Sequence, residues 1–205
     1  MKIPFTHTEL DLRSVFHRRT PKVDDHFGVY FITGRQGSGK TYYACKFASE
    51  VDLKKITIKT NIHSLKLPHV DFDKIEELYT DTDEHCLYLI DEVSRKYDKN
   101  SRTDTQFYAW LNQSRKRKRV VILITQEWRE LPMWIRRPAK VMMSTKPTAI
   151  LSMFGFYSIT WGDAENMVFN KDESEYECPP IKKVIHKRNR KIASLYDTFE
   201  PINQL

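Results

Sequence analysis

One stretch of eight residues constrains this chain more than any other part of its sequence. Residues 34–41 read Gly-Arg-Gln-Gly-Ser-Gly-Lys-Thr and fit the phosphate-binding loop pattern G-x-x-x-x-G-K-[ST] without departure. The flanks agree with this pattern, because Val29–Thr33 is a short apolar, β-branched run that predicts a buried strand, and Thr41–Glu50 predicts a helix. A strand, a glycine-rich loop and a helix in this order predict a site for the phosphates of a nucleotide.

The residue types of the loop explain how it would bind phosphate. Glycines allow the backbone to curl so that successive N–H groups point at phosphate oxygens, next to the positive end of a helix. Lys40 is expected to reach the β- and γ-phosphates, and the Thr41 hydroxyl is expected to ligate Mg²⁺. The sequence therefore predicts ATP and Mg²⁺ as cofactors. The residues expected to contact the nucleotide are Gly34, Arg35, Gln36, Gly37, Ser38, Gly39, Lys40 and Thr41.

A second motif, Leu87–Glu92, is an apolar strand that ends in two carboxylates. Asp91, at the strand tip, is expected to hold Mg²⁺ through water, opposite Thr41. Glu92 lies just past the tip, where a carboxylate can orient and polarise the attacking water. Downstream of a phosphate-binding loop, this pair of acids favours a hydrolase over a kinase or a switch GTPase.

The next predicted strand, Val120–Ile124, carries candidate residues at both ends. Gln126 follows its carboxyl end, and it points at the γ-phosphate if this strand lies beside the first one. The run Arg-Lys-Arg-Lys-Arg at 115–119 precedes its amino end. Such a run indicates a solvated face or a nucleic-acid contact, and one of its arginines could instead reach the ATP of a neighbouring subunit as a finger. Arg115 is the first candidate for that finger, and the next are Arg117 and Arg119.

Charge and cysteine content bear on partners and compartment. The chain has 34 Lys and Arg against 27 Asp and Glu, a net charge of +7, which suits nucleic acid or a membrane surface but also serves solubility. The three cysteines have no metal-ligand spacing, and their sparse, odd number indicates a reducing compartment. No apolar run approaches the roughly 18 residues of a membrane span. The sequence therefore predicts a cytoplasmic protein with no membrane span.

The alternation of predicted strands and helices from residue 28 onward indicates an α/β fold with a mostly parallel central sheet flanked by helices. After Pro147, residues 154–169 predict a β-hairpin or small extension, and residues 182–191 form a basic tail. The expected strands are 29–33, 56–60, 86–90, 120–124 and 139–145, and the expected helices are 41–50, 71–79 and 105–116.

We divide the 205 residues into three parts. Residues 1–27 form an N-terminal arm, either a strap over the core or a binding arm. Residues 28–150 form the ATPase core, and residues 151–205 form a C-terminal extension of the same domain. In that extension we expect Lys182, Lys183, Lys187 and Arg188 to contact DNA phosphates.

Together, Gly34–Thr41, Leu87–Glu92, the basic helix end and Ile122–Gln126 resemble the FtsK–HerA superfamily of DNA-translocating ATPases, over roughly residues 28–145. Within it, the chain is similar to the genome-packaging ATPases of membrane-containing icosahedral viruses and to the zonula occludens toxin-like assembly proteins of filamentous phages. The segment Leu195–Thr198 is similar to an ending used in these groups. The resemblance implies a RecA-like core, Mg-ATP hydrolysis and a ring around DNA, usually a hexamer. It supports the roles given above to Lys40, Thr41, Asp91, Glu92 and Gln126.

Two features depart from the filamentous-phage group. Its members generally carry a membrane span after the core, which this sequence lacks, and the arginine at the position of Arg115 is usually followed by His or a small residue.

The leading hypothesis is an oligomeric ATPase that moves DNA and packages a viral genome. Its expected partners are DNA, other copies of the chain, and capsid or phage assembly proteins, in the host cytoplasm or at the virion. The alternatives are a phage assembly and export ATPase, a nucleotide-gated assembly protein without motor activity, and a small-molecule kinase. The kinase is disfavoured because Glu92 follows Asp91 and no arginine-rich lid separates the core strands.

Overall fold

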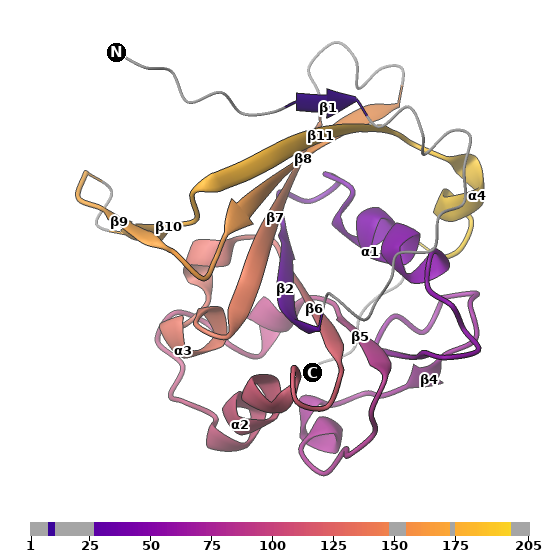
Figure 1. Ribbon diagram of the computed structural model, residues 1–205, viewed down its shortest axis with the longest axis horizontal. Coiled ribbons are helices and arrows are strands. Elements are labelled where there is room, and N and C mark those ends of the chain that lie inside the picture. The colour runs from indigo at the N-terminus through magenta and orange to yellow at the C-terminus, as the bar shows by residue number, and fades with distance from the viewer. Residues whose placement is uncertain (1–7, 11–26, 148–154, 173–174, 198–205) are drawn as a thin grey trace.

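A central β-sheet of nine strands, in the order β1-β11-β8-β7-β2-β6-β5-β3-β4, organises the part of the chain that the structure describes (Figure 1). The structure is a computed structural model, and it describes residues 8–10, 27–147, 155–172 and 175–197. The strands of this sheet are β1 Thr8–Leu10, β2 Gly28–Thr33, β3 Thr57–Thr60, β4 Val70–Asp71, β5 Cys86–Ile90, β6 Val120–Thr125, β7 Ala139–Pro147, β8 Phe156–Asp163 and β11 Pro180–Lys187.

The strand that leads into the glycine-rich loop, β2, lies at the centre of a parallel region. It pairs in parallel with β6 on one side and with β7 on the other, and β5, β3 and β4 continue the parallel order beyond β6. At the last residue of β2, Thr33 pairs with Thr125 of β6 and with Ser144 of β7. The carboxyl ends of these strands therefore meet at one edge of the sheet, which is where ligands bind in open parallel sheets.

Strand β6 shows why the central strands have continuous apolar sequences. All six of its residues are buried. Val121 and Leu123 pack into the hydrophobic cluster on one face of the sheet, and Ile122 and Ile124 pack into the cluster on the other. Because successive side chains of a strand point to opposite faces, a strand covered on both sides must be apolar at every position.

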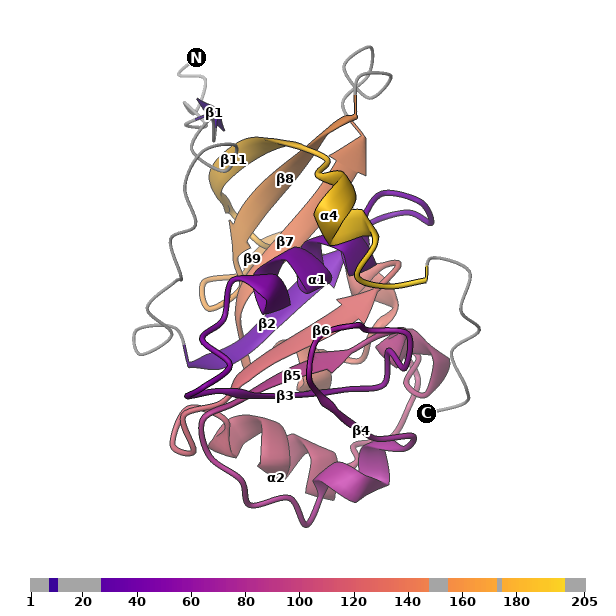
Figure 2. The same ribbon diagram turned by 90° about the vertical axis from the view of Figure 1, so that its right-hand side faces the viewer.

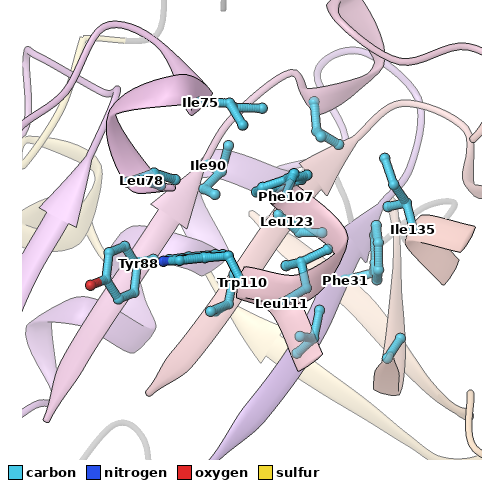
Figure 3. Close-up of a cluster of buried hydrophobic side chains, with 14 of the residues drawn as sticks. Phe31, Ile75, Leu78, Tyr88, Ile90, Phe107, Trp110, Leu111, Leu123 and Ile135 are labelled. Atoms are coloured by element: carbon cyan, nitrogen blue, oxygen red, sulfur yellow. The ribbon is translucent and has the colours of Figure 1, made fainter. Parts of the chain in front are cut away.

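Helices cover the two faces of the sheet (Figure 2). Helix α1, Lys40–Ser49, packs on one face, and helix α2, Thr105–Gln113, packs on the other. On the α2 face, the Trp110 ring meets the Tyr88 ring edge-on, with centroids 4.9 Å apart (Figure 3). The Asp104 carboxylate caps α2, because its Oδ1 accepts hydrogen bonds from the backbone N–H groups of Gln106 and Phe107 at 3.2 and 3.0 Å. The shorter helices are α3 Met133–Arg136 and α4 Arg190–Ala193, with 3-10 turns at Ile75–Leu78, Val93–Arg95 and Trp128–Glu130.

The five predicted core strands are confirmed, and the predicted helices 71–79 and 105–116 are shorter than expected. In the first, only Ile75–Leu78 is helical, as a 3-10 turn, and its apolar residues repeat every third position, which matches three residues per turn. In the second, α2 ends at Gln113 because the chain must turn into β6. Lys118, which adopts a left-handed conformation with φ of 52°, completes that turn.

The C-terminal part joins the sheet more fully than the sequence predicts. Strand β8 pairs antiparallel with both β7 and β11. A separate two-stranded ribbon, β9 Val168–Asn170 with β10 Glu175–Glu177, projects from the body (Figure 1). Most of the segment predicted as a basic tail is strand β11, which corrects that prediction.

Two further sequence predictions concern the arm and membrane spans. Of the predicted arm 1–27, the structure describes strand β1, which pairs in parallel with β11, and residue 27; the other residues of the arm lie outside the described part. Residues 198–205 also lie outside it. Among the residues described, no helix has the length and apolar character needed to cross a bilayer.

Candidate functional site

The loop between β2 and α1 has the backbone conformation that its glycines predict. Gly34, Gly37 and Gly39 have φ angles of 150°, 75° and 92°. These angles are unfavourable for residues with a side chain. At Gly34 space also excludes any other residue, because an added Cβ would lie 2.5 Å from the backbone oxygen of Thr145.

Hydrogen bonds tie this loop to the strands on both sides of β2. Toward β6, the Gly34 backbone N–H and the Thr33 hydroxyl both donate to the backbone oxygen of Gln126, each at 3.1 Å. Toward β7, the Thr145 hydroxyl donates to the backbone oxygen of Thr33 at 3.1 Å and lies 2.7 Å from the Ser38 hydroxyl. The loop is therefore fixed relative to both neighbouring strand tips.

The tip of β5 brings a carboxylate to the start of α1. Asp91 is 4% exposed, and its Oδ2 accepts a hydrogen bond from the Thr41 hydroxyl at 2.9 Å. Burial raises the pKa of Asp91, while the hydrogen bonds from Thr41 and from the Glu92 backbone N–H oppose that rise. A carboxylate and a hydroxyl at this distance are the hard oxygen ligands that Mg²⁺ prefers, so this pair fits the predicted metal site.

Lys40 lies close to these acids. Burial lowers the pKa of its ammonium group, and the charges of Asp91 and Glu92 oppose that change. Its Nζ donates a hydrogen bond to the backbone oxygen of Arg35 at 3.2 Å. The ammonium group is thus held over the curled loop, where the predicted phosphate contacts would form.

Glu92 has an unusual backbone for a residue with a side chain, with φ of 53° and ψ of 42°. A non-glycine residue in this left-handed region costs roughly 1–2 kcal/mol, and such strain gathers at functional sites. The Glu92 carboxylate forms an ion pair with Nε of Arg95, three residues further on. Arg95 is not among the residues predicted for the site, although a basic residue three positions after an acid is a recognisable signal for such a pair.

Asn61 is a second residue of the site that was not predicted from the sequence. It directly follows β3, it is 2% exposed, and its side chain bonds to both backbone groups of Asp91. Its Nδ2 donates to the Asp91 backbone oxygen at 3.1 Å, and its Oδ1 accepts from the Asp91 backbone N–H at 2.8 Å. Asn61 therefore holds the tip of β5 in place. A polar residue directly after a predicted buried strand was the available signal.

A cavity of about 550 Å³ joins these elements. Its volume lies within the range of small-molecule sites. Gln126 lines it from the tip of β6, and the condition for its expected role is met, because β6 pairs with β2. Gly34 and Arg35 are not part of its lining; Gly34 anchors the loop, and Arg35 supplies the carbonyl that binds Lys40. The predicted site residues that line the cavity are Gln36, Gly37, Ser38, Gly39, Lys40, Thr41, Asp91, Glu92 and Gln126.

The predicted finger candidates lie at the other edge of the sheet. The Gly28 N–H donates to the Arg119 backbone oxygen at the amino end of β2, whereas the loop follows its carboxyl end. Arg119 is 0% exposed, and its guanidinium donates to the backbone oxygens of Asp83 and Asp81 at 2.7 and 2.8 Å. This buried structural role removes Arg119 from the predicted fingers. Arg115 is exposed.

Arg188, one of the residues expected to contact DNA, is exposed and lines the cavity beside the glycine-rich loop. Tyr42, Tyr196 and Asp197 line the same cavity, and sequence analysis assigned none of them to the site. These residues come from α1 and from the end of the chain, so sequence spacing offers no signal that they meet.

Comparison with known proteins agrees with this geometry. The profile of the "ATPase family associated with various cellular activities (AAA)" matches residues 30–146. The N-terminal domain of zonular occludens toxin from Neisseria meningitidis is similar in structure, with a TM-score of 0.61 and 18% identity over 83% of this chain and 98% of that one. The genome packaging NTPase B204 from Sulfolobus turreted icosahedral virus 2, in complex with ATP-gammaS, has a TM-score of 0.51 and 14% identity over 81% of this chain and 98% of that one. A comparison with curated protein sequences found no match.

Proposed function

The chain belongs to the ATPase family associated with various cellular activities (AAA), and on that premise we propose that it is an oligomeric motor that moves DNA and packages a viral genome. It is an ATP-hydrolysing enzyme of the phosphate-binding-loop type. The observation that carries the proposal is the meeting of Thr41, Asp91, Glu92 and Gln126 around one cavity, with the Thr41 hydroxyl 2.9 Å from Asp91.

In the proposed reaction, different residues of the cavity bind phosphate, activate water and hold the metal ion. The backbone N–H groups of residues 36–41 and the Lys40 ammonium bind the phosphates. Glu92 orients the attacking water and polarises it, and Gln126 contacts the γ-phosphate. Thr41 and Asp91 would hold Mg²⁺, which would supply charge neutralisation on the β- and γ-phosphates.

The ion pair between Glu92 and Arg95 affects how the water-activating group acts. In the structure the Glu92 carboxylate is occupied by its ion pair with Arg95. Glu92 must therefore release Arg95 before it can orient the water. The rigid tip of β5, held by Asn61, limits that movement to the side chain.

The location of Arg115 supports an oligomer. Strand β6 separates it from the phosphate-binding edge, and six strand residues span roughly 17–20 Å. An arginine side chain does not extend that far, so a role for Arg115 in hydrolysis requires the ATP of a neighbouring subunit. A finger supplied in this way makes hydrolysis depend on assembly.

The DNA part of the proposal is supported by charge. The chain carries a net charge of +7, and the exposed residues Arg115, Lys116 and Lys118 form a basic patch at the end of α2. Phosphate contacts of this kind bind DNA with little regard to sequence. The fold is shared with a genome packaging NTPase, which is consistent with a packaging role for this chain.

A phosphate-release assay with and without DNA tests the proposal, with Lys40→Ala as the control that lacks the phosphate contact. Turnover that DNA stimulates in the unmodified protein, and that Lys40→Ala abolishes, is the expected result. Binding of ATP without turnover would instead identify a nucleotide-gated assembly protein. Transfer of the phosphoryl group to a small acceptor would identify a kinase. Adding single- and double-stranded DNA in parallel identifies the form of DNA that the motor engages.

A further inference from the structure

The order of the strands determines which half of the cavity faces the nucleoside. The acids of β5 and Gln126 of β6 lie on one side of β2, whereas β7, β8 and β11 lie on its other side. The γ-phosphate must lie on the side of the acids, since the attacking water and Glu92 meet there. A nucleotide with its phosphates on the loop therefore extends its sugar and base toward β7, β8 and β11.

The edges of β8 and β11 form a wall on that side. Lys187, the last residue of β11, pairs with Phe156, the first residue of β8, so both meet at the carboxyl edge of the parallel strands. The next residue, Arg188, is joined to β8 through a hydrogen bond of 2.7 Å from its backbone N–H to the oxygen of Gly155. Gly155, Phe156 and Arg188 all line the cavity.

Tyr42 holds this wall against the loop. It comes directly after Thr41 in α1, is 3% exposed, and accepts a hydrogen bond on its hydroxyl from the backbone N–H of Asn189 at 2.7 Å. The guanidinium carbon of Arg188 lies 5.9 Å from the centre of the Tyr42 ring. The arginine is thus exposed to the cavity and supported by an aromatic ring.

From this arrangement we propose that Arg188 binds the nucleoside part of the nucleotide within the same subunit, with its planar guanidinium stacked on the base. The guanidinium is planar and lies near the Tyr42 ring on the cavity side, and arginine stacks on bases through its planar face. This inference rests on the proposed nucleotide-hydrolysing function. It assigns Arg188 a role distinct from Arg115, which acts on a neighbour, and from Lys40, which binds phosphate.

Binding of ADP and of inorganic pyrophosphate, each measured by calorimetry, tests the inference without turnover. The two ligands share a diphosphate, and only ADP has a nucleoside. Arg188→Ala should weaken ADP binding about tenfold, which is the size of a desolvated cation–π or stacking contact, and should leave pyrophosphate binding unchanged. Arg188→Lys keeps the charge but lacks the planar group, so it should weaken ADP binding to a similar extent.

Arg137→Ala is the matched control, because Arg137 is exposed but lies outside the cavity lining. It should bind both ligands as the unmodified protein does. Lys40→Ala should weaken the binding of both ligands, and this result would verify that pyrophosphate occupies the loop. Equal losses for ADP and pyrophosphate in Arg188→Ala would make Arg188 a phosphate ligand and overturn the inference. Unchanged ADP binding in Arg188→Ala would also overturn it, while leaving the proposed function intact. Failure of the unmodified protein to bind ADP or ATP would overturn both.

Discussion

The two ends of strand β6 have opposite roles, although both carry polar residues directly beside a fully buried strand. At the carboxyl end, Gln126 lines the cavity, and its backbone oxygen accepts bonds from Thr33 and Gly34. At the amino end, Arg119 is buried against Tyr88 and Trp110, with its guanidinium carbon 5.4 and 5.3 Å from the two ring centres. In a parallel sheet the carboxyl edge collects the groups that act on ligand. At the amino edge, Arg119 instead belongs to the packed core.

Burial also distinguishes basic residues that look equivalent in the sequence. The run 115–119 reads as a single basic segment, yet its last arginine is part of the core. Arg117 donates from Nη1 to the backbone oxygen of Thr82 at 2.8 Å, which fastens the turn before β6. Arg115, Lys116 and Lys118 are exposed. These three are the most exposed residues of the run, and Arg117 is partly exposed.

The largest expected effect is on the rate of ATP hydrolysis, through Arg115 at the amino edge of the sheet and the ATP of a neighbouring subunit. Arg115→Ala subunits should hydrolyse ATP about 10³–10⁵-fold more slowly, because they lack the cation that stabilises the transition state in the neighbour. Lys40→Ala subunits should also be inactive alone, but they keep Arg115. Mixing the two inactive variants should restore part of the turnover, measured as phosphate release per subunit. Arg137→Ala serves as the exposed-arginine control.

A mixture that stays inactive, although both variants are found in the same assemblies, would show that Arg115 is not the finger. Arg117 would then be the remaining candidate of the run, because Arg119 is buried. The amino edge would keep only structural and DNA-binding roles if Arg117→Ala also left turnover unchanged.

The next effect concerns the two ends of β5. Glu92→Gln should lower turnover about 10²–10⁴-fold while ATP still binds, since the amide preserves shape but cannot polarise water. Glu84→Gln is the matched control, because Glu84 is an exposed acid at the opposite end of the same strand. Single-turnover phosphate release and ATP binding are the two measurements. Normal turnover in Glu92→Gln would assign the water-activating role to another residue.

A smaller effect concerns the stability of the protein. Substituting a buried member of the basic run should lower the free energy of unfolding more than substituting an exposed one. Arg119→Met should lower the free energy of unfolding by about 3 kcal/mol, because it removes a buried charge with two hydrogen bonds and leaves the Asp81 and Asp83 carbonyl groups without these donors. Lys116→Met, at an exposed position, should change it by less than about 0.5 kcal/mol. Urea unfolding measures both. Equal effects would mean that burial does not distinguish the two positions.

The smallest expected effect concerns DNA at the amino edge. Replacing Lys116 and Lys118 with Gln should reduce the slope of log affinity against log salt by about two, one for each lost phosphate contact. Replacing the exposed pair Lys54 and Lys55, which lies outside the basic run, should leave the slope unchanged. The measurement is DNA binding across a series of salt concentrations. Equal slopes in all three proteins would reduce the basic patch to an ordinary solvated surface.

Local features of this protein were readable from the sequence. The glycine-rich loop, its flanking strand and helix, and the apolar strand that ends in Asp91 and Glu92 depend on residues close together in the chain. Backbone conformation and burial on both faces act over such short distances, so residue types and their spacing reveal them. The fold class and eight of the eighteen residues that line the cavity were therefore predictable from these local features.

Tertiary structure alone decided which distant segments meet. The pairing of β6 with β2 brings Gln126 to the loop, and the pairing of β11 with β8 brings Arg188 to the same cavity. Asn61 could be seen to end a strand, but not to hold the backbone of Asp91. Strand order and side-chain burial arise from packing summed over the whole sheet, which no local pattern records. For the same reason, five consecutive cations were predicted as one basic run, and the fold buried Arg119 while it left Arg115 at the surface.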